Sequence, residues 1–110
     1  MEPEMLKFYV RWRMNPKETF KTPEERGKFV MVMLGSVKAE MQAGAIKDFG
    51  ICTDGSGGYA IYEVPNEADV FASLQKWTPH VHFDARRVLT VEQLIQARKG
   101  PATASEKQTP

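Results

Sequence analysis

Basic and apolar side chains alternate near the start of the chain, a pattern that predicts an anion site. The odd positions of residues 6–14 carry Lys7, Tyr9, Arg11 and Arg13, and the even positions are all apolar. Strict alternation is typical of a strand with one buried face, so the basic side chains should share the opposite face. A guanidinium grips a carboxylate through two parallel hydrogen bonds, and enclosed cations need a counter-charge. We therefore predict that Arg11 and Arg13 bind a carboxylate.

The two histidines of the chain, His80 and His82, are close in sequence to the carboxylate of Asp84. On a strand these alternate residues would share one face, about 7 Å apart. An imidazole exchanges protons near neutral pH, which makes His82 and Asp84 the candidate catalytic residues. A metal site with Asp84 as third ligand is the less favoured interpretation, because no further His or Cys supports it. We expect no metal, and an exposed position after the helix-ending Pro79 best explains His80.

These residues suggest a mechanism that needs no cofactor. Arg11 and Arg13 would anchor a small organic acid, His82 or Asp84 would move a proton on the carbon next to a carbonyl, and nearby cations would stabilise the enolate. Tyr9 shares the arginine face and is expected to line the wall. The competing interpretation is a solvated face whose cations pair with Glu63 or Asp84.

The elements that must position these residues follow from periodicity and capping signals. Thr22, Pro23 and Glu25 predict the start of a helix whose apolar stripe ends at Gly44. Residues 46–53 and 59–64 are predicted strands, joined by a glycine-rich turn over residues 54–58.

A second helix follows, capped by Asn66 and ended by Thr78 and Pro79. Its predicted buried stripe consists of Val70, Phe71, Leu74 and Trp77. A strand over residues 81–89 and a short helix beginning at Thr90 complete the order.

The element order β-α-β-β-α-β is that of a ferredoxin-like α+β fold, a four-stranded antiparallel sheet with two helices on one face. In this topology the fourth strand lies beside the first, which would bring His82 and Asp84 near Arg11 or Arg13. We expect a single domain over residues 5–99 and a disordered tail over residues 100–110. Because the second sheet face lacks a cover, two copies closing face to face would form a dimeric α/β barrel with a cavity.

Residues 5–90 of the sequence resemble the muconolactone isomerase family. The matching features are the opening strand as far as Asn15 and Pro16, the helix closed by Gly44, and residues 59–64 followed by Asn66 to Asp69. The resemblance implies a dimeric α+β barrel, in some members built into a ring of dimers, and a cofactor-independent isomerase. These motifs are mostly structural, so they bear on the fold more than on the chemistry.

Composition narrows the function classes. The formal charge is +1, without the basic excess that nucleic-acid binding needs, and residues 59–62 lack the basic-glycine start of an RNA-reading strand. No apolar run approaches the roughly 20 residues of a membrane span, and the single cysteine excludes a disulfide framework. We expect a cytoplasmic protein that binds a small carboxylate or lactone. The alternatives are a non-catalytic binding module and a cofactor-independent monooxygenase-like enzyme.

Overall fold

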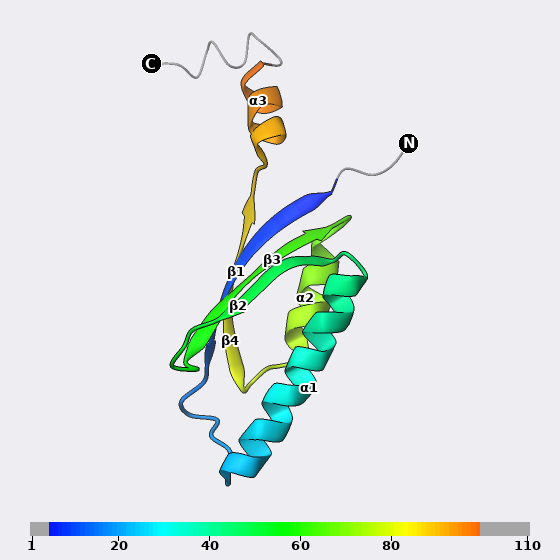
Figure 1. Ribbon diagram of the computed structural model, residues 1–110. Coiled ribbons are helices and arrows are strands. Elements are labelled where there is room, and N and C mark those ends of the chain that lie inside the picture. Colours follow the sequence, from blue (N-terminus) through cyan, green and yellow to red (C-terminus); the bar gives the residue numbers. More distant parts are fainter. Residues whose placement is uncertain (1–4, 100–110) are drawn as a thin grey trace.

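The computed structural model describes residues 5–99, which form a four-stranded sheet and three helices (Figure 1). The predicted tail, residues 100–110, lies outside the described residues. In chain order the elements are β1 (Leu6–Met14), α1 (Pro23–Gln42), β2 (Ile46–Ile51), β3 (Gly57–Val64), α2 (Glu67–Gln75), β4 (Val81–Val88) and α3 (Val91–Lys99). Among the helices of the described range, none has the length and apolar character needed to cross a membrane.

Strand β1 lies in the middle of the sheet, whose order is β2-β3-β1-β4. It pairs antiparallel with β3 on one side and with β4 on the other. Helices α1 and α2 lie on the same face of this sheet (Figure 1). The predicted antiparallel βαββαβ arrangement is therefore confirmed.

The alternation in β1 divides the sheet into a core face and an open face. Phe8, Val10 and Trp12 are at most 5% exposed and belong to the two apolar clusters under the helices. Arg11 and Arg13 occupy the odd positions of the same strand and are exposed on the opposite face. The burial of the even positions thus fixes where the cations point.

The predicted helix caps are present. The Thr22 hydroxyl accepts a hydrogen bond from the Glu25 amide at 3.1 Å, and the Asn66 side chain accepts one from the Asp69 amide at 3.2 Å. Gly44 follows the end of α1 with a φ of +89°, a left-handed conformation that glycine adopts without a steric penalty. These local signals set the ends of the two helices that cover the core.

The hairpin differs from the sequence prediction. Strand β3 begins at Gly57, within the residues predicted as a turn, and β2 ends at Ile51 rather than at residue 53. A side chain at Gly57 would collide with the backbone of Trp12, and one at Gly58 with the backbone of Gly50. These glycines therefore serve close packing within the sheet. The connection between the two strands, residues 52–56, lies two residues earlier in the chain than predicted.

The buried stripe of α2 also differs from the prediction. Phe71 is 66% exposed, whereas Ser73 is buried. The Ser73 hydroxyl forms a buried 2.8 Å hydrogen bond with the hydroxyl of Tyr62, a residue of β3. The hydrogen bond satisfies both hydroxyl groups, so Ser73 can be buried although it is polar. Hydrophobicity alone predicts Phe71 on the buried face of α2 instead.

Replacing Tyr62→Phe tests this buried hydrogen bond. At neutral pH we expect a loss of about 1–2 kcal/mol of unfolding free energy, because Ser73 loses its partner. Burial raises the pKa of Tyr62 to about 12, from an ordinary value of 10.0. As pH rises between these two values, the phenol of Tyr62 ionises in the unfolded wild type but stays neutral in the folded protein, so the free energy of unfolding falls. The variant lacks this phenol and does not lose stability in this way.

Urea unfolding at neutral pH and above pH 10 measures both effects. The stability difference between the two proteins should shrink at the higher pH. A difference that stays constant across this range would contradict the buried phenol.

Candidate functional site

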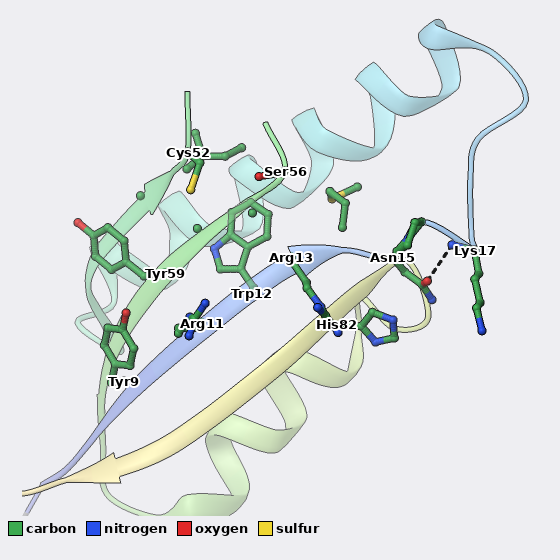
Figure 2. Close-up of a pocket in the computed structure, with 16 residues that line it drawn as sticks. Tyr9, Arg11, Trp12, Arg13, Asn15, Lys17, Cys52, Ser56, Tyr59 and His82 are labelled. Atoms are coloured by element: carbon green, nitrogen blue, oxygen red, sulfur yellow. Dashed lines mark hydrogen bonds between the residues drawn. The ribbon is translucent and has the colours of Figure 1, made fainter. Parts of the chain in front are cut away.

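A hollow of about 930 Å³ lies on the open face of the sheet, where β1 ends and the β2–β3 hairpin turns (Figure 2). Its floor is the exposed side of β1, which contributes Tyr9, Arg11 and Arg13. The hairpin strands supply one wall, including Tyr59, and His82 of β4 lies at the other side. Four of the five residues predicted for the site line this hollow, and Asp84 does not.

Strand register explains how the predicted residues meet. Arg13 pairs with His82 and Arg11 pairs with Asp84 across the β1–β4 ladder. On the other side, Arg11 pairs with Tyr59. The expected proximity of β4 to the arginines is therefore confirmed, since directly opposed residues of an antiparallel pair present their side chains on one face.

The hollow is rich in positive charge. Arg11, Arg13 and Lys17 line it, and no Asp or Glu is among its lining residues. Within residues 5–99 the sole ion pair joins Arg86 to Asp84, at 3.3 Å. Arg11 and Arg13 thus have no carboxylate partner in the described part of the chain, which favours an anion site over cations paired with Glu63 or Asp84.

Two phenol rings flank Arg11 at one end of the hollow (Figure 2). The Tyr59 hydroxyl donates a 2.7 Å hydrogen bond to Asp48 Oδ2, and the Phe49 amide donates to the other oxygen of this carboxylate. The hydrogen bond to Asp48 raises the pKa of Tyr59 above its ordinary value, and partial burial adds to this. Tyr59 is therefore held in place as a neutral phenol, while Tyr9 is 38% exposed.

His82 and Asp84 occupy different surroundings. His82 is exposed and lies beside Arg13 (Figure 2). Asp84 contributes to a smaller hollow of about 360 Å³ on the β4 side, which Arg11, Arg13 and His82 also line. Both carboxylate oxygens of Asp84 face Arg86 Nε, at 3.3 and 3.4 Å. His82 accordingly borders both hollows, together with Arg11 and Arg13.

The third member of the predicted group, His80, does not share their face. It precedes β4, so the alternation of a strand does not apply to it. Its ring stacks on Phe20, with centroids 4.6 Å apart, and packs against Phe29 of α1 at 5.0 Å. His80 therefore does not join His82 and Asp84, and within residues 5–99 no three such side chains lie close enough together to hold a metal ion.

Some residues that line the hollow were not predicted. They lie just after β1 and at the hairpin tip, and include Asn15, Lys17, Cys52 and Ser56. Asn15 Oδ1 accepts a 2.9 Å hydrogen bond from the Lys17 amide, which shapes the turn that carries the lysine (Figure 2). Asn15 followed by proline, the pattern that predicts the end of this strand, also forms the turn.

Comparison with known families adds a further finding. The family model described as a domain of unknown function, DUF3303, matches residues 6–101. The chain belongs to this family. The DUF3303 match includes every residue that lines the larger hollow. A comparison with the curated proteins finds no match.

The Tyr59–Asp48 hydrogen bond yields a direct test of this geometry. Replacing Asp48→Asn removes the charge beside the phenol, so the pKa of Tyr59 should fall toward its ordinary value. Tyrosinate absorbance during a pH titration measures the change, and Tyr59→Phe identifies which component belongs to this residue. Asp54→Asn is the matched control, because Asp54 bonds Ser56 at the hairpin tip. Equal titrations for Asp48→Asn and the wild type would refute the hydrogen bond.

Proposed function

We propose that this protein binds a small organic acid or lactone in the hollow on the open sheet face. The observation that supports it is the set of three cations, Arg11, Arg13 and Lys17, with no acidic residue among their neighbours in the lining. The chain as a whole has a formal charge of only +1, so this concentration of positive charge is a local feature of the hollow. An anion is the ligand that would neutralise it.

The spacing of the arginines suits a carboxylate. Arg11 and Arg13 are alternate residues on one strand, about 7 Å apart, so their planar groups can converge on one anionic group or hold two groups of a diacid. Tyr9 and Tyr59 then offer aromatic surface and hydroxyls to the remainder of the molecule. Within this proposal the preferred ligand has a carboxylate or a lactone at one end and a compact carbon frame.

The proposal includes a homodimer. Two copies whose open faces meet would turn each exposed hollow into an enclosed cavity, in which charge–charge attraction is stronger because less water screens it. The resemblance to the muconolactone isomerase family supports this part, because dimeric barrels of that kind enclose their sites between sheets. A larger ring of dimers is compatible with it.

The proposed reaction is a cofactor-independent isomerisation. The imidazole of His82 would remove a proton from the carbon next to a carbonyl, and the electron pair would move to the carbonyl oxygen as an enolate. Arg13, which pairs with His82 across the ladder, would stabilise that oxygen. In an unsaturated acid or lactone this enolate is conjugated with the carbon–carbon double bond. Return of the proton from His82 to the far carbon of that conjugated system shifts the double bond and completes the isomerisation. If no proton moves, the same hollow is a non-catalytic binding module; a monooxygenase-like enzyme is the remaining alternative.

Loss of the two arginines should abolish ligand binding. We expect dicarboxylates or lactones to raise the melting temperature of the wild type, because a ligand at 100 times its Kd stabilises by roughly 2.7 kcal/mol. Arg11→Ala with Arg13→Ala should remove at least nine-tenths of that shift. Arg87→Ala, on the opposite face of β4, should retain it. No shift in the wild type with any of these compounds, or equal shifts in all three proteins, would refute the anion site.

Proton exchange separates an enzyme from a binding module. With a compound that binds, the wild type in D₂O should replace hydrogen by deuterium on the carbon next to the carbonyl, as followed by NMR. His82→Gln should keep the thermal shift and slow this exchange at least a hundredfold, since the proton carrier is lost. His80→Gln, which alters the histidine packed on Phe20, should exchange like the wild type. A bound compound that does not exchange with the wild type would leave only the binding module.

A further inference from the structure

The turn that follows β1 brings a lysine to the edge of the hollow. Residues 15–18 form a β-turn, in which the Glu18 amide donates a 3.2 Å hydrogen bond to the Asn15 carbonyl. Proline, whose ring fixes φ, is favoured at the second position of such a turn, and Pro16 occupies it. Lys17 follows at the third position and lines the hollow (Figure 2). Because Lys17 lies outside the strand, its place depends on the turn.

Asn15 holds this turn in place through each of its polar atoms. Its side-chain oxygen accepts a hydrogen bond from the Lys17 amide at 2.9 Å, and its side-chain nitrogen donates one to the Pro79 carbonyl at 2.9 Å. Its backbone amide donates to the His80 carbonyl at 2.8 Å, and its own carbonyl accepts the bond that closes the turn. Pro79 and His80 directly precede β4, which carries His82. The backbone of Lys17 is therefore tied to the strand that borders the hollow on its other side.

The ammonium of Lys17 has no acidic partner among the described residues. The ion pair found within residues 5–99 joins Arg86 to Asp84. Glu18, the next residue in the turn, lines a different hollow of about 380 Å³, which is formed by residues between 14 and 26. Lys17 therefore adds a positive charge to those of the two arginines, and no side chain of the hollow neutralises it.

The two arginines already suffice for one carboxylate. An ionised carboxylate has two oxygens with about four lone-pair positions. Arg11 and Arg13 share one strand face, and each planar fork can supply two parallel N–H donors. A carboxylate that is gripped by both forks has no position left for a third cation. Lys17 then stays unpaired unless the ligand carries a second anionic group.

We infer that Lys17 binds a second carboxylate, so that the ligand of the hollow is a short dicarboxylate; this inference rests on the proposed anion site. Asn15 is the positioning residue that holds Lys17 for this contact. The Cα atoms of Arg13 and Lys17 are at most about 14 Å apart, because four residues separate them, and the turn shortens this distance. Since both side chains line the same hollow, a diacid with a short carbon chain can contact both at once.

Calorimetric titration of the full chain tests the inference with two pairs of compounds, succinate with its monoamide and glutarate with its monoamide. Each monoamide keeps the carbon chain and one carboxylate but lacks the second charge. The wild type should bind the better diacid at least fivefold more tightly than its monoamide. Lys17→Met should bind the two within a factor of two of each other, because the ammonium is lost while an apolar stem is kept.

Lys21→Met is the matched control for the loss of a lysine. Lys21 belongs to the same connection between β1 and α1, but it lines the hollow that Glu18 lines and not the one with the arginines. The variant removes the same charge from the same loop. It should keep the wild-type preference for the diacid.

Two variants of Asn15 test its positioning role. Asn15→Ala keeps the lysine but removes the bonds to the Lys17 amide and the Pro79 carbonyl, so the preference for the diacid should fall below twofold while the monoamide still binds. Asn15→Ser offers a hydroxyl that can accept from the amide two residues on, and it should restore a preference of at least threefold. A role in stability alone would leave the ratio of the two affinities unchanged. If circular dichroism shows Asn15→Ala to be unfolded, Pro16→Ala loosens the same turn and should lower the preference at least twofold.

Several outcomes would overturn the inference. A wild type that binds a diacid and its monoamide equally refutes the second contact, as does a preference that survives Lys17→Met. A preference unchanged in Asn15→Ala, or in Pro16→Ala where that variant replaces it, refutes the role of Asn15. Arg11→Ala with Arg13→Ala separates the two proposals. If diacid and monoamide bind equally and both need the arginines, the anion site stands and only the second contact fails; if neither compound binds to the wild type, both proposals fail.

Discussion

The burial of alternate residues in β1 is the constraint on which the rest of the structure depends. Val10 is fully buried, and Phe8 and Trp12 nearly so, while β1 is held on both edges by β3 and β4. A slip of one residue would move Arg11 and Arg13 into the core and expose these apolar side chains. Unpaired guanidinium groups cost several kcal/mol each in such a setting. The cations therefore stay on the open face because the core admits no other register.

The carboxylates nearest to the hollow are already engaged elsewhere. Asp48 accepts hydrogen bonds from Tyr59 and from the Phe49 amide, and Asp84 faces Arg86. These contacts lie at the surface, where solvent screens them, so they contribute little to the stability of the fold. Neither carboxylate forms a salt bridge with Arg11 or Arg13, since Asp48 bonds neutral donors and the ion pair of Asp84 is with Arg86. The two arginines therefore keep their donors available on the open face.

Sequence patterns predicted the features that depend on local spacing. The alternation of β1, the Thr22 and Asn66 caps and the left-handed Gly44 all depend on near neighbours and were confirmed. The errors involve distant contacts. Ser73 is buried because Tyr62 comes from another element, and His80 turns toward Phe20 rather than joining His82. The start of the second hairpin strand was predicted too late for the same reason, since Gly57 and Gly58 pair with β1 rather than forming a turn.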